Sequence, residues 1–120
     1  MFGITLKSTA PAVPFWEHVD AASALEPRPS IRGLDYAPHI TLARYEDIDP
    51  VLLTGALAAF NGEAAFALTF DAIRAFDGDQ IVLWLSPQPD ERLFEAHARL
   101  HDTIAPLLCD PHYRPGAWTP

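Results

Sequence analysis

The residues of this sequence best suited to chemistry are a histidine and a threonine one position apart. His39 and Thr41 lie in the segment Pro38-His39-Ile40-Thr41-Leu42. Histidine titrates near neutral pH and can act as a general acid or base, and a threonine hydroxyl can hydrogen-bond a phosphate oxygen. Cleavage of a phosphoester needs two acid/base groups, because the attacking oxygen must lose a proton and the leaving oxygen must gain one. This segment supplies one of the two.

The element that must position this pair is a strand, which hydrophobic alternation predicts over residues 39–45. Side chains alternate across a strand, so His39 and Thr41 share its open face while their aliphatic neighbours anchor the other face in the core. Tyr45 has the same parity as His39 and is therefore a candidate for the wall of a cleft.

The remaining elements are predicted from periodicity, with Asp49 and Asp90 as helix caps and Asp77-Gly78-Asp79 as a hairpin turn. Pro106 is expected to end the last helix. The order β-α-β-α-β-β-α-loop predicts an α+β fold with helices outside a sheet. The expected strands cover residues 2–7, 39–45, 65–76 and 80–86. Three helices are expected: one that ends near residue 25, one over residues 50–60 and one over residues 90–104.

Length and composition narrow the class of protein. A chain of 120 residues is expected to form one domain. The net charge of −8 argues against binding long duplex nucleic acid, which draws on many Lys and Arg contacts, but it allows a small phosphate-bearing substrate. No apolar run is long enough to suggest a membrane span, and the single cysteine, Cys109, fits a reducing compartment. These features predict a cytoplasmic protein that does not contact membranes.

A short repeat links the histidine motif to the end of the chain. Tyr36-Ala37-Pro38 leads into His39, and Trp118-Thr119-Pro120 repeats its order of aromatic, small residue and proline. The residue before a proline is held extended, so each copy is suited to lead into a strand. We therefore expect domain 1–120 to be incomplete at its C-terminus, with a second motif and further strands belonging after residue 120.

On these motifs the sequence resembles the 2′-5′ RNA ligase and cyclic phosphodiesterase family, the two-histidine phosphoesterases. The resemblance covers nearly the whole chain, from a first strand at Phe2-Gly3-Ile4-Thr5-Leu6 through the His39 motif to the approach beginning at Arg114. It implies two pseudo-symmetric lobes of antiparallel-type sheet with helices outside, each lobe carrying one His-x-Thr/Ser motif. The second His-x-Thr motif is not among these 120 residues.

The resemblance implies a function as well. The intact protein would be an enzyme for RNA processing that opens 2′,3′-cyclic phosphates, or makes and breaks 2′-5′ phosphodiester linkages, without metal or other cofactor. His39 would be one of the two acid/base histidines and Thr41 a ligand of a phosphate oxygen. The alternative is a nucleotide- or RNA-binding domain that keeps the cleft but lacks the second motif and does not turn substrate over.

Other residues have less specific interpretations. Tyr113 could stack on a base, Arg114 could bind phosphate and Trp118 could line the cleft, although a solvated loop and a core tryptophan are the plainer alternatives. His97 and His101 lie four residues apart on the last helix, a spacing that suits a metal, but they border its apolar stripe and are expected to be partly packed. Trp16 and Trp84 are expected to be core residues, and Cys109 is expected to be a structural thiol.

The expected partner is a small nucleotide or an RNA terminus that bears a cyclic phosphate. We expect a monomer. The alternative is that a second chain completes the sheet, because a sheet without its last strands has an open edge.

Overall fold

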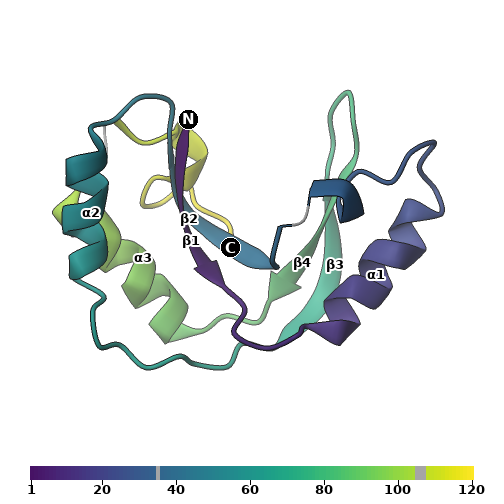
Figure 1. Cartoon of the computed structure of the whole chain (residues 1–120), viewed down its shortest axis with the longest axis horizontal. Helices are drawn as coiled ribbons and strands as arrows, with labels where there is room; N and C mark the ends of the chain where they lie inside the picture. The colour runs from purple at the N-terminus through teal and green to yellow at the C-terminus, as the bar shows by residue number, and fades with distance from the viewer. Residues whose placement is uncertain (35, 105–107) are drawn as a thin grey trace. The chain divides into compact units, whose positions relative to one another are not determined.

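The computed structural model describes residues 1–34, 36–104 and 108–120 (Figure 1). Within these ranges it is an α+β structure with three α-helices and two antiparallel two-stranded sheets, β1-β2 and β3-β4. The predicted α+β class is confirmed, whereas the pseudo-symmetric pairing of two lobes stays a prediction. The elements are β1 (Phe2–Lys7), α1 (Val13–Ser23), β2 (His39–Tyr45), α2 (Pro50–Ala58), β3 (Phe70–Phe76), β4 (Val82–Pro87) and α3 (Glu91–Thr103), with 3-10 turns at Arg32–Leu34 and Pro111–Tyr113.

The chain forms two compact units. The N-terminal unit is Thr5–Ile40, and the main unit combines Met1–Ile4 with Thr41–Pro120. Every buried side chain in the described ranges belongs to the main unit, so the hydrophobic core lies there. The buried residues come from β1, β2, β4, α2, α3 and the segments that follow β2 and α3: Ile4, Leu42, Ala43, Tyr45, Ile48, Ala56, Pro87, Leu93, Ala96, His97, Leu100, His101, Ile104 and Cys109.

Both predicted helix caps are present. The Asp49 carboxylate accepts a hydrogen bond from the Val51 backbone N–H at 2.9 Å, and Asp90 does the same for Arg92 at 2.9 Å. Each cap satisfies one of the N–H groups that a helix leaves unpaired in its first turn. Helices α2 and α3 end one or two residues before their predicted ends. Pro106, which was expected to end α3, lies outside the described residues.

The predicted hairpin is confirmed as β3 and β4, which pair antiparallel from Phe76↔Val82 to Phe70↔Pro87. Trp84 stacks on Phe76 with ring centroids 5.2 Å apart, and it is half-buried. Trp16 in α1 is also half-buried, beneath the guanidinium of Arg32 at 4.5 Å. The expectation that both tryptophans belong to the core is therefore wrong, because each lies on an element that is largely exposed.

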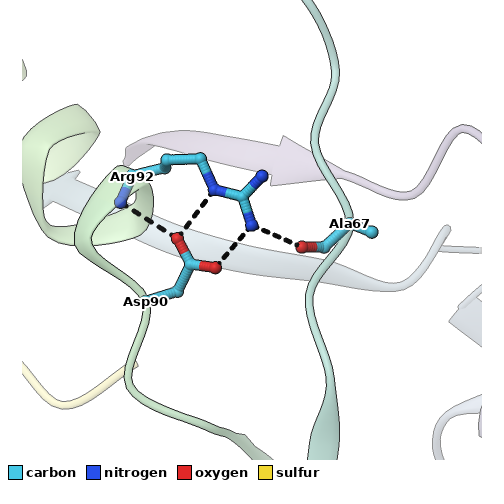
Figure 2. A network of polar contacts seen from close by, with 3 residues as sticks. All are labelled: Ala67, Asp90 and Arg92. Atoms are coloured by element: carbon cyan, nitrogen blue, oxygen red, sulfur yellow. Dashed lines mark hydrogen bonds and ion pairs between the residues drawn. The ribbon is translucent and has the colours of Figure 1, made fainter.

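The strand predicted from residue 65 begins only at Phe70, and Arg92 of α3 binds the segment before it. Figure 2 shows Asp90 receiving hydrogen bonds from the Arg92 backbone and guanidinium, while the same guanidinium donates to the Ala67 carbonyl at 3.1 Å. The Arg92 guanidinium also lies 4.9 Å from the centroid of the Phe66 ring. This segment has the alternation of a strand, and the carbonyl of its last residue, Thr69, accepts a hydrogen bond from the Gln88 N–H at 2.7 Å, next to the β3-β4 pairing.

Candidate phosphoesterase site

The site residue predicted first, His39, opens β2 and is exposed. Its Nδ1 lies 2.9 Å from the carbonyl oxygen of Ala37. A carbonyl oxygen can only accept a hydrogen bond, so Nδ1 carries a proton, and in the neutral form of the ring the lone pair is at Nε2. The backbone thereby selects the tautomer that can take up a proton at Nε2.

The chain that leads into His39 is held by backbone contacts in the N-terminal unit. Pro38 favours an extended conformation for the residue before it. Its carbonyl accepts a hydrogen bond from the Ser8 N–H at 3.0 Å, which ties the entry of β2 to the end of β1. The ring of Tyr36, which is largely exposed, stands edge-on to the imidazole at 6.4 Å between centroids.

Thr41, the second predicted residue, lies two positions further along β2 and is half-exposed. Its backbone carbonyl accepts a hydrogen bond from the indole Nε1–H of Trp118 at 2.9 Å. The next two side chains, Leu42 and Ala43, are both buried, so the predicted alternation of an open and a packed face ends after Thr41. The second half of β2 is covered on both sides by the main unit.

The C-terminal segment is part of that cover and runs beside β2 (Figure 1). The Asp110 N–H donates to the Arg44 carbonyl at 2.8 Å, and the Arg114 Nε–H donates to the Cys109 carbonyl at 2.9 Å. Gly116 has a φ of +86°, in the left-handed region that favours glycine. The turn at Gly116 lets the chain return Trp118 to Thr41.

The Trp118 indole, whose N–H binds the Thr41 carbonyl, also packs against two aromatic rings of α3. The Trp118 ring is parallel to that of His97, with centroids 4.0 Å apart and an interplanar angle of 1°, and it meets Phe94 edge-on at 6.0 Å. His97 Nε2 donates to the Tyr113 carbonyl at 2.8 Å. Burial lowers the pKa of His97, against the hydrogen bond to Tyr113, which raises it, and nearby His101 lowers it further.

His97 and His101 are both about 5% exposed, so the expectation that they lie partly packed at the edge of the apolar stripe understated their burial. The Nε2 atom of His101 lies 3.4 Å from the Leu42 carbonyl, on the backbone of β2. Both histidines thus direct Nε2 at backbone carbonyls. Among the described residues, no three His, Cys, Asp or Glu side chains gather in a way that could hold a metal ion.

Tyr45, predicted as a cleft wall, is completely buried. Burial, together with the neighbouring Cys109 thiol, raises the pKa of Tyr45 to about 12. Burial also raises the pKa of the Cys109 thiol. These two side chains pack together in the core, which agrees with a structural role for Cys109.

Arg114 borders a shallow hollow of about 460 Å³ beside Glu46, Cys109, Asp110 and His112. The two carboxylates that line this hollow are both ion-paired with Arg44, at 3.3 Å for Glu46 and 3.9 Å for Asp110. The Tyr113 side chain is half-exposed, and its backbone carbonyl accepts the His97 hydrogen bond. These contacts give the segment a packing role.

The structure brings two predicted site residues together, Thr41 and Trp118. It also reveals two neighbours that sequence reasoning left out, Tyr36 beside His39 and His97 beside Trp118. The sequence indicated Tyr36, because this residue begins the segment that leads into the His39 motif. No feature of the sequence indicated that His97 contacts Trp118, because the contact joins α3 to a distant loop.

Comparison with known proteins gives one result. The model of the 2'-5' RNA ligase superfamily matches residues 11–120, and this chain therefore belongs to that superfamily. No match was found among curated proteins, and none among solved structures. Within the described residues, no helix is both long and apolar enough to cross a membrane.

Proposed function

We propose that the protein is an RNA-processing phosphoesterase for 2′,3′-cyclic phosphates or 2′-5′ phosphodiester linkages, with His39 as one of two general acid/base groups. Membership in the 2'-5' RNA ligase superfamily supports this class of reaction. The observation that carries the proposal is the hydrogen bond from His39 Nδ1 to the Ala37 carbonyl. It leaves the Nε2 atom of an exposed ring ready to exchange a proton with a bound substrate.

In this proposal Thr41 holds the phosphate. It follows His39 by two residues on β2, the spacing that directs two side chains to the same face of a strand. Its hydroxyl would donate to a non-bridging phosphate oxygen and stabilise the negative charge that builds there during the reaction.

The second acid/base group is proposed to come from another His-x-Thr motif joined to the chain after Pro120. The contact between Trp118 and the Thr41 carbonyl supports this arrangement. Pro120 is two residues beyond Trp118, at most about 7 Å of extended chain. A motif attached there would begin near the Thr41 part of β2.

The proposed reaction needs only these groups. One histidine takes a proton from water as its oxygen bonds to the phosphorus of the cyclic phosphate. The bond from phosphorus to one ribose oxygen breaks, and the other histidine gives that oxygen a proton. The product is an open phosphomonoester, and each histidine ends in the protonation state that the other had at the start, so proton exchange with solvent restores both.

The substrate is proposed to be a small nucleotide or the terminus of an RNA. The net charge of −8 supports a short ligand over a long duplex. The exposed Tyr36 ring beside His39 is a suitable surface for an unpaired base. Base stacking by Tyr113 and phosphate binding by Arg114 stay predictions from the sequence.

The test is turnover of a 2′,3′-cyclic nucleotide by the full-length protein and by its His39→Ala variant. General acid/base catalysis by a positioned side chain contributes roughly 10²- to 10⁴-fold, so His39→Ala should lose at least about 10²-fold in kcat. The melting temperature should stay unchanged, because His39 is exposed. His18→Ala is the matched control, since His18 is an exposed histidine on α1 and should leave kcat unaltered. Full activity of His39→Ala would refute the assignment.

A further inference from the structure

We propose that Trp118 is a positioning residue for the Thr41 part of the site. Its indole N–H on the Thr41 carbonyl and its stack on His97 fix where the C-terminal segment meets β2. The inference rests on the proposed function and adds how one half of that site is held. It assigns Trp118 a role through Thr41, in place of direct contact with substrate.

Trp118 holds the backbone of Thr41 through a hydrogen bond. Trp118 Nε1 lies 2.9 Å from the carbonyl oxygen of Thr41, within the normal range for a hydrogen bond. In a strand, ψ is confined to a narrow range, so the carbonyl and Cβ of one residue keep nearly the same relative direction. Restraining the Thr41 carbonyl therefore restrains the position of its Cβ, from which the hydroxyl projects.

The Trp118 indole is itself held in place by two aromatic rings. It lies flat on the buried His97 ring at 4.0 Å, and Phe94 contacts it edge-on at 6.0 Å. His97 in turn donates to the carbonyl of Tyr113, in the same C-terminal segment. Rotation of the indole would break two aromatic contacts together with the hydrogen bond.

The C-terminal segment follows a defined path along β2. It is bound to the strand at the Arg44 carbonyl through Asp110, and again at the Thr41 carbonyl through Trp118. The segment therefore runs opposite to β2 and leaves the strand beside Thr41. Trp118 is the last of these two attachments before the chain reaches Pro120.

A second tryptophan provides an internal comparison. Trp84 is half-buried and stacked on Phe76, as Trp118 is on His97, but its Nε1 has no hydrogen-bond partner in the described parts of the chain. Trp84→Phe thus removes an unused donor, whereas Trp118→Phe removes one that holds Thr41. Both replacements keep an aromatic ring.

The experiment measures kcat and KM for a 2′,3′-cyclic nucleotide in the full-length protein and in both variants, with hydrogen exchange of the indole N–H groups followed by NMR. Trp118→Phe should lower kcat about tenfold, which corresponds to about 1.4 kcal/mol, with KM within about twofold of the original. It should remove a slowly exchanging indole signal. Trp84→Phe should leave both kinetic constants unaltered.

Several outcomes would overturn the proposal. Unchanged kcat in Trp118→Phe would do so, as would a rise in KM alone, which would make Trp118 a substrate contact. A loss of activity that only follows the unfolded fraction would leave Trp118 with a purely structural role. If the wild-type protein does not turn over a cyclic phosphate, the proposed function fails and this inference with it. If His39→Ala is inactive while Trp118→Phe is unaffected, this inference alone fails.

Discussion

Mild acid should destabilise the folded protein through His97. Its ring is buried between the Trp118 ring and neighbouring His101, with its Nε2–H on the Tyr113 carbonyl. Burial lowers the pKa of His97 from its ordinary 6.5 in the folded protein. Between that lowered value and 6.5, the unfolded chain binds a proton that the folded chain does not. Stability therefore rises with pH in this window and falls as the pH drops below about 6.5.

The size of the effect has an upper limit set by one proton. For a site that stays neutral in the folded state, lowering the pH from about 7 to about 5.5 costs at most about 1.3 kcal/mol. Partial protonation in the folded protein makes the expected loss about 1 kcal/mol or less. The pKa values of Asp20, Glu63 and Asp90 are lowered by their arginine partners, so these carboxylates titrate below the window and do not mask it.

The assay is urea unfolding at pH 7 and pH 5.5 for the wild type and for His97→Phe. The replacement keeps a ring against Trp118 but leaves the Tyr113 carbonyl without its donor, which should cost about 1 kcal/mol at pH 7. It should also reduce the stability lost on going to pH 5.5. His18→Phe, at an exposed histidine, should retain the wild-type difference. An equal difference in His97→Phe and the wild type would refute the reasoning.

Other predictions concern the backbone and the core. Gly116→Ala should lower stability by about 1 kcal/mol in urea unfolding, because alanine disfavours a φ of +86°. Asp49→Ala should cost about 1 kcal/mol in the same experiment by removing the N-cap of α2, whereas Asp49→Ser should retain most of the stability. Cys109, about 1% exposed and with a raised pKa, should resist iodoacetamide in the native protein and react in urea, as followed by mass spectrometry. Rapid native labelling would contradict its placement.

The elements around the site could be predicted from the sequence wherever their signals are local. The bounds of β2 follow from alternation, the starts of α2 and α3 follow from Asp49 and Asp90, and the hairpin follows from its turn residues. The segment before β3 could not be predicted in this way. Its alternation suits a strand, but Arg92 binds it to α3 through the Ala67 carbonyl.

The surroundings of the candidate site were harder to predict, because they depend on contacts between distant parts of the chain. The burial of Tyr45 depends on its packing with Cys109, far along the chain. The partner of Trp118 is a backbone carbonyl, and backbone acceptors are the same at every residue, so no residue type could identify Thr41 as that partner. Motif spacing could identify His39 and Thr41, but not what holds them.

The most direct test of the central claim is to measure kcat and Kd for a 2′,3′-cyclic nucleotide with the full-length wild-type protein and with His39→Ala. A catalytic role predicts that the variant loses at least about 10²-fold in kcat while its Kd stays within a few-fold, because the phosphate contact proposed for Thr41 is retained. A wild-type protein that binds the nucleotide without opening it, or a variant with unchanged kcat, would contradict the account and favour a binding domain.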